Sequence, residues 1–153
     1  MPIRGPLTHV DLSISDPDAS LPFYEALFSA LGYERLDVPY ADFQGERPRR
    51  AAWQLRFDSG ASFGIEVRPS SGPNRRRRND RYAPGMHHMA FHAESPADVD
   101  RIHRALVEAG ATVLDPPAAY TGQRGYTPGY YAAFYADPDG IKIEVAHIPD
   151  ANP

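Results

Sequence analysis

The stretch LTHVDLSIS at residues 7–15 opens a repeat that decides the fold. The pattern returns as HHMAFHAES at residues 87–95, and in each copy a proline-marked helix start and a run rich in Ala and Leu follow. The two copies close on GIEV at Glu66 and KIEV at Glu144, about 78 residues apart. A repeated supersecondary unit buries its apolar face against its neighbour. We therefore expect two similar modules that pack together as one domain.

Alternation of polar and apolar residues defines the first module. Residues 7–14 alternate with a period of two, which predicts a half-buried strand with His9 on its polar side. A helix is expected to begin after a capping side chain at Ser15 or Asp16 and to end at Gly32. Three further strands are predicted near residues 33–39, 51–57 and 61–68.

The second half of the chain repeats this plan. A strand is predicted at residues 86–93 and a helix from Ser95 to Gly110, and strands follow near residues 111–114, 130–136 and 141–147. We therefore predict an α+β fold of two βαβββ modules in a single domain that covers residues 1–153. Its parts are module 1 at about residues 6–68, a linker rich in Pro, Gly and charge at residues 69–85, and module 2 at about residues 86–148.

Four polar residues occupy matching positions in the two copies. On each of their strands the candidate lies opposite the large apolar residues, so a period of two places it on the face turned away from the helices. Two imidazoles with one or two carboxylates suit borderline divalent metals such as Fe²⁺, Mn²⁺, Ni²⁺, Zn²⁺ or Co²⁺. Burying two glutamates without a cation would be costly. The predicted metal ligands are His9, Glu66, His88 and Glu144.

The remaining histidines and the aromatic residues have weaker signals. His92 has the parity of His88, which favours a place in the cleft or on the surface, whereas His87 should face away from it. His103 and His147 are expected to be structural or exposed. An aromatic lining suits a flat or apolar ligand, although tyrosines also fill barrels. The residues expected to rim the cleft are Trp53, Tyr120, Tyr126, Tyr130, Tyr131 and Tyr135.

Composition narrows the class of protein. The chain has no cysteine, which excludes thiolate metal sites, cysteine nucleophiles and disulfides. No stretch has the length of a signal peptide or a membrane span, so we expect a cytoplasmic protein without membrane contact. A net charge of −4 argues against a nucleic-acid partner. The run Arg75–Arg78 is interpreted as a solvated linker, with a lid over an anionic substrate as the alternative.

The closing segment DPDGIKIEV at residues 137–145, together with the paired histidines, resembles the vicinal oxygen chelate superfamily. This group includes glyoxalase I, extradiol ring-cleaving dioxygenases and the fosfomycin- and bleomycin-resistance proteins. The resemblance covers nearly the whole chain. It implies an incomplete barrel around a divalent metal that chelates adjacent substrate oxygens. It also implies His9, His88 and Glu144 as the usual ligand triad, with Glu66 as the fourth ligand found in glyoxalase I.

The resemblance leaves three functions open. In a glyoxalase-like lyase or isomerase acting on a small substrate with adjacent oxygens, Glu66 or Glu144 would serve as the general base. In an extradiol-type dioxygenase acting on an aromatic diol, Glu66 would stay off the metal, and Tyr135 or His92 would handle protons. The third function is a non-catalytic, drug-sequestering resistance protein. Open strand edges also favour a homodimer, because a partner chain can cover them.

Overall fold

The computed structural model describes residues 7–37, 50–122 and 125–149 of the chain. The first module contains helix α1 (Pro17–Ala30) and a sheet in the order β1 (His9–Ile14), β4 (Ser62–Pro69), β3 (Ala51–Arg56) and β2 (Glu34–Leu36). The second contains helix α2 (Pro96–Glu108) and a sheet in the order β5 (His88–His92), β8 (Lys142–His147), β7 (Tyr131–Ala136) and β6 (Thr112–Ala119).

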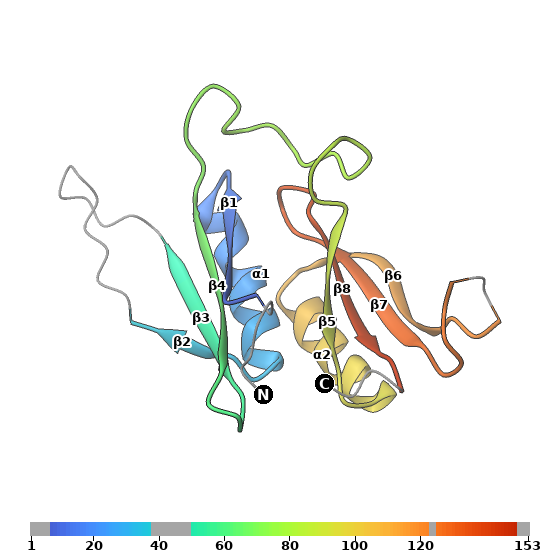
Figure 1. Ribbon diagram of the computed structural model, residues 1–153. Coiled ribbons are helices and arrows are strands. Elements are labelled where there is room, and N and C mark those ends of the chain that lie inside the picture. The colour runs from blue at the N-terminus through green and yellow to red at the C-terminus, as the bar shows by residue number, and fades with distance from the viewer. Residues whose placement is uncertain (1–6, 38–49, 123–124, 150–153) are drawn as a thin grey trace.

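The two modules share one topology. In each, the first strand pairs in parallel with the last, and the other neighbours are antiparallel. In the described ranges, the strands form two separate four-stranded sheets rather than a closed barrel, with β1 and β5 at the facing edges (Figure 1). The prediction of an α+β fold built from two βαβββ modules is therefore confirmed.

Both helices begin and end where the sequence indicates. The Asp16 carboxylate accepts a hydrogen bond from the amide of Asp18 at 2.9 Å, and the Ser95 hydroxyl accepts one from the amide of Asp98 at 3.1 Å. Such caps satisfy amide groups that have no partner within the helix. After the C-terminal end of α1, Gly32 has a φ of +82°, a conformation that glycine adopts without steric cost.

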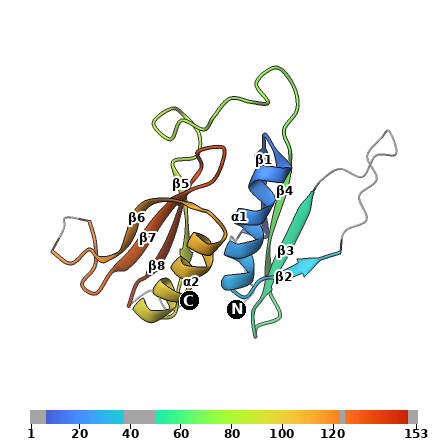
Figure 2. The ribbon, with the colours of Figure 1, turned by 180° about the vertical axis from the view of Figure 1, so that it is seen from behind.

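The hydrophobic core is shared by the two modules. Helices α1 and α2 pack against each other on the same side of the two sheets, as the view from behind shows (Figure 2). Phe28 joins the modules, because its ring centroid lies 4.8 Å from that of Trp53 and 5.8 Å from that of Phe91. Leu12, Val67 and the equivalent residues of module 2 complete this core.

A polar contact between the modules lies at the turn between β7 and β8. The Tyr24 hydroxyl of α1 donates a hydrogen bond to Asp137 at 2.7 Å, and the Ser15 amide donates one to Asp139 at 2.8 Å. The linker also contacts this turn, because the Asn79 amide donates a hydrogen bond to the Asp139 carbonyl at 2.8 Å. Asp137 is buried, and this burial raises the pKa of its carboxyl group.

Strand β6 departs from the sequence prediction. It was expected to end at residue 114, but it continues to Ala119 with shifts of register on either side of Asp115. The predicted length is therefore wrong. Pro116 and Pro117 have no amide hydrogen to donate, and an edge strand with irregular pairing tolerates them. The strand expected at residues 33–39 is the short β2, with residues 38 and 39 outside the described part of the chain.

Candidate metal-binding site

The four candidate ligands lie on the sheet faces opposite the shared core. Their strand neighbours Ile65, Val67, Ile143 and Val145 are buried on the helix side. The register is also equivalent, because Glu66 lies opposite Asp11 in one module and Glu144 lies opposite Ala90 in the other. Each module therefore contributes one histidine and one glutamate from corresponding positions.

In module 2 these two residues are in contact. His88 Nε2 lies 3.2 Å from Glu144 Oε2, and Glu144 is only 4% exposed. The hydroxyl of Tyr130 donates a hydrogen bond to the other carboxylate oxygen, Oε1. Burial is the main reason why the pKa of the Tyr130 hydroxyl is raised, and this hydrogen bond raises it further. The carboxylate is thus held by Tyr130 on one side and presents its second oxygen to the imidazole.

The second ring nitrogen of His88 also has a partner. Its Nδ1 lies 2.7 Å from Nδ1 of His87, so one of these nitrogens donates a hydrogen bond to the other. This contact leaves Nε2 of His88 directed at Glu144. His87 was expected to face away from the cleft; it precedes β5, where the alternation of the strand does not apply, and its ring contacts that of His88. His92 is exposed at the far end of β5, with its ring centroid 6.3 Å from that of His147.

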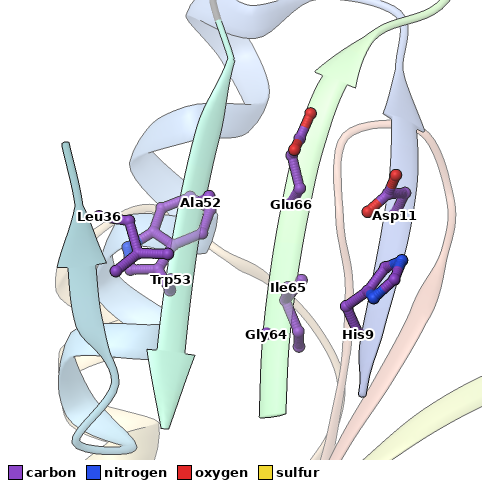
Figure 3. A pocket seen from close by; sticks show the side chains of 8 residues that line it. All are labelled: His9, Asp11, Leu36, Ala52, Trp53, Gly64, Ile65 and Glu66. Carbon is purple, nitrogen blue, oxygen red and sulfur yellow. The ribbon is translucent and has the colours of Figure 1, made fainter. Parts of the chain in front are cut away.

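In module 1 the corresponding residues line a cavity of about 280 Å³ (Figure 3). His9, Asp11 and Glu66 point toward the viewer from β1 and β4 in this figure. Arg68 lies 2.6 Å from a carboxylate oxygen of Asp11 and 3.0 Å from one of Glu66, and Arg50 lies 3.7 Å from Glu66. The negative charge of both carboxylates is therefore compensated by arginine.

In the described part of the chain, the candidate ligands of the two modules do not come together. Within the described residues, no group of three or more His, Asp or Glu side chains is close enough to hold a metal ion. His88 and Glu144 fit part of a coordination shell, since an imidazole nitrogen and a carboxylate oxygen face each other on a sheet. Completing that shell requires donors that lie elsewhere in this chain or in a second copy.

An aromatic cluster adjoins Glu144. The ring of Tyr120 stacks on Tyr126 with centroids 5.1 Å apart, and Tyr126 meets Tyr130 edge-on at 4.8 Å. Phe134 lies behind them, with its centroid 5.6 Å from that of Tyr120. Aromatic faces beside a polar centre are typical of sites that bind flat ligands.

The other aromatic residues predicted to rim the cleft lie on the helix side. Tyr135 is fully buried and its hydroxyl lies 3.0 Å from Nδ1 of His103, while Tyr131 donates a hydrogen bond to Asp100 at 2.9 Å. Trp53 borders the cavity of module 1, but its ring packs behind β3 (Figure 3). The Tyr135 hydroxyl thus lies on the helix side of the sheet, away from Glu144, and is not placed to transfer protons there. The sequence did not identify Tyr130 as the partner of Glu144, although its parity with Phe134 is a usable signal.

Comparison with known proteins agrees with this architecture. The sequence profile of the Glyoxalase/Bleomycin resistance protein/Dioxygenase superfamily matches residues 7–145. The chain belongs to this superfamily. It is 28% identical over 139 residues to the uncharacterized protein YqjT of Bacillus subtilis (strain 168), which covers 90% of this chain and 94% of that protein.

Solved structures of this superfamily share the fold. A Bacillus halodurans protein provisionally described as a glyoxalase is 25% identical, with a TM-score of 0.70 over 94% of this chain and 96% of that one. A glyoxalase/dioxygenase from Nostoc punctiforme is 20% identical, with a TM-score of 0.62 over 95% of this chain and 92% of that one. Among the helices described for this chain, none has the length and apolar character needed to cross a membrane.

Proposed function

We propose that the chain is a divalent-metal-dependent enzyme that acts on a small substrate with two adjacent oxygens. The observation that supports this proposal is the His88–Glu144 pair, whose nitrogen and oxygen lie 3.2 Å apart on the open face of module 2. Superfamily membership supports it independently. The metal would be Fe²⁺, Mn²⁺, Ni²⁺, Zn²⁺ or Co²⁺, all of which accept imidazole and carboxylate ligands.

The residues that would hold the metal are His9, His88 and Glu144. When bound, a divalent ion of this kind supplies Lewis-acid polarisation of substrate oxygens. Tyr130 would hold the orientation of the Glu144 carboxylate, and a hydrogen bond donated by Nδ1 of His88 to His87 would leave Nε2 of His88 free for the metal, as partners of metal ligands commonly do. The aromatic cluster of Tyr120, Tyr126 and Tyr130 would position a flat substrate beside these ligands.

Lyase or isomerase chemistry is the first candidate and requires a residue that moves a proton. Glu66 lies on the cleft face of module 1 and would act as a fourth ligand or as the general base. For this it has to exchange its contact with Arg68, 3.0 Å away, for the substrate. Glu144 is the alternative base, and its proton would then be shared with the Tyr130 hydroxyl.

Ring-cleaving dioxygenase chemistry is the second candidate, and one observation favours it. Because Arg68 and Arg50 already compensate the charge of Glu66, this carboxylate is held away from a role as metal ligand. Three protein ligands would leave positions for a bidentate diol and for dioxygen. His92, exposed on the same face of β5 as His88, would then handle protons.

The metal requirement is tested by elemental analysis after anaerobic purification and reconstitution with each of the five metals. We expect about one metal per chain, and loss of binding in His88→Ala because one imidazole ligand is removed. His103→Asn is the matched control, since His103 contacts Tyr135 rather than the cleft. A wild-type chain that stays metal-free with every metal would contradict the enzymatic proposal and favour a drug-sequestering protein.

Glu66→Gln separates the two reactions. If Glu66 is the base, the variant should lower turnover of an α-oxoaldehyde hemithioacetal by about 10²–10⁴-fold. If the chain is a dioxygenase, oxygen uptake with catechols and Fe²⁺ should persist nearly unchanged in the variant. Glu34→Gln, at an exposed position on β2, controls for the loss of one charge. Catechol-dependent oxygen uptake that survives Glu66→Gln would exclude the lyase candidate.

A further inference from the structure

The arginine run of the linker borders a second cavity, which the proposed metal chemistry does not use. The linker between β4 and β5 passes over the end of β1 and the turn before β8, at the upper end of Figure 1. There it encloses a cavity of about 220 Å³. The lining is polar, with Ser13, Ser15, Ser70, Asn79, Arg75 and Arg77 among its residues.

The two arginines are held in place by the backbone of the linker. The Arg75 amide donates a hydrogen bond to the Gly72 carbonyl at 3.3 Å, and the Arg77 amide donates one to Asn74 at 2.9 Å. The hydroxyl of Ser70 donates to the Arg75 carbonyl. These turns place Arg75 and Arg77 on the same cavity, whereas Arg78 lines a different one beside Asp137.

The positive charge of this run is uncompensated. All four residues of Arg75–Arg78 are exposed, and in the described ranges none of them forms an ion pair with a carboxylate. Asp139 is the one acidic residue that lines the cavity, and one of its oxygens already accepts a hydrogen bond from the Ser15 amide. Arg75 and Arg77 therefore line this cavity together with several residues that carry hydroxyl or amide groups, and the Arg75 guanidinium makes a long contact of 3.5 Å with the Gly72 carbonyl.

We propose that this cavity binds an oxyanion, the phosphate or carboxylate group of a small molecule. Guanidinium groups match both oxyanions with paired hydrogen bonds, and the hydroxyls of Ser13 and Ser15 and the side-chain amide of Asn74 can donate the remaining ones. The site is separate from the metal ligands, because Ser13 lies four residues along β1 from His9, about 13 Å for an extended strand. The proposal therefore does not depend on metal binding.

The test is calorimetric titration of the metal-free, full-length chain with inorganic phosphate and with succinate, at low ionic strength. We expect the preferred anion to bind with a Kd in the millimolar range or tighter, and Arg75→Ala/Arg77→Ala to weaken it at least tenfold. Arg76→Ala/Arg78→Ala removes the same charge from the same run and should change the Kd by less than about twofold. Arg75→Lys/Arg77→Lys keeps the charge but loses the paired geometry, so it should weaken binding to an intermediate degree.

Three outcomes would overturn the proposal. The first is the absence of binding by either anion to the wild-type chain. The second is an equal loss in both alanine double variants, which would indicate a diffuse electrostatic attraction. The third is arginine-dependent binding of a short nucleic-acid duplex without binding of phosphate or succinate, which would identify a polyanion surface instead. The lysine variant preserves the charge and most of the side-chain length of both arginines. It therefore keeps the test valid if the alanine variant folds poorly.

Discussion

Two glutamates at equivalent positions have different surroundings. Glu66 and Glu144 are both buried, and each lies on the last strand of its module. Arg68 follows Glu66 by two residues and turns to the same face, but the equivalent residue in module 2 is Ala146. Among the described residues, Glu144 consequently has no arginine partner and contacts His88 and Tyr130. The residue two positions further along the strand, Arg68 or Ala146, thus contributes to the different surroundings of the two carboxylates.

Tyr130→Phe tests whether the hydroxyl of Tyr130 orients Glu144. The variant removes the hydrogen bond to Oε1 but keeps the ring, so the aromatic cluster should persist. We expect the affinity for the divalent metal to fall by about 10–100-fold, as is common when a partner of a metal ligand is lost. Chelator competition measures this change. Tyr82→Phe, at a hydroxyl that is largely exposed, should leave the affinity unaltered. Equal affinities in Tyr130→Phe and the wild type would show that Tyr130 does not orient the ligand.

At the scale of helices and strands, local chemistry made most elements predictable. Caps such as Asp16 and the alternation in β1 and β8 depend on neighbouring residues, and both are readable from the sequence. The same alternation predicted which face each candidate ligand occupies. The contacts of Tyr135 and His87 were not predicted, for different reasons. Tyr135 has the parity of the core, whereas His87 lies before its strand and is placed by a contact with His88.

Contacts between distant parts of the chain were not predictable from spacing. Neither the salt bridge of Arg68 with Asp11 nor the hydrogen bond of Tyr24 with Asp137 has a local signature. Each depends on how strands or modules meet after folding. The sequence therefore indicated the candidate ligands, but it did not indicate that His88 contacts Glu144 whereas Glu66 contacts Arg68.

Asp137, in the buried turn between β7 and β8, should make the free energy of unfolding depend on pH. Burial raises the pKa of this carboxyl group, so the folded chain holds the proton more tightly than the unfolded chain. The resulting stabilisation is complete below the unfolded-state pKa and is lost as the pH rises through the folded-state pKa. Asp137→Asn has no such group. In urea unfolding, the wild type should therefore lose stability relative to this variant as the pH rises from the usual pKa of an aspartic acid through the raised pKa of Asp137.

Tyr24→Phe tests the same carboxyl group by removing its hydrogen-bond donor. The Tyr24 hydroxyl donates to Asp137 and lowers the pKa of that carboxyl group. Its removal should steepen the decline of stability with pH, because the ionised carboxylate then loses a donor. A difference between the wild type and Asp137→Asn that stays constant over this pH range would refute the assignment.

At the scale of the whole molecule, the two sheets face each other with unpaired edges. Strands β1 and β5 border a largely apolar cavity of about 490 Å³, which is lined by residues of both modules, including Val10 and Phe91. Leu7 and Phe57 at its margin are 68% and 46% exposed. Unpaired edges beside exposed apolar side chains are typical of surfaces that a partner chain covers. We expect a homodimer, with light scattering giving twice the 16.9 kDa mass of the chain.

The dimer would also complete the metal site if module 1 of one copy meets module 2 of the other. In a heterodimer of His9→Ala and His88→Ala chains, one composite site then keeps both histidines and the other loses both. We expect one metal per purified heterodimer, and none in either variant homodimer. A metal-free heterodimer would show that each site forms within one chain, and a monomer at micromolar concentration would remove the basis for the experiment.

The contact between Tyr24 and Asp137 has a consequence for biosynthesis. Its partners are 113 residues apart, and the Ser15–Asp139 contact spans 124 residues. While the ribosome is still translating the second half, the first helix has no partner for its buried hydroxyl, and Phe28 lacks part of its packing surface. Domains generally fold as units during synthesis. The N-terminal half of this protein must therefore wait, incompletely folded, until Asp137 and Asp139 have left the exit tunnel.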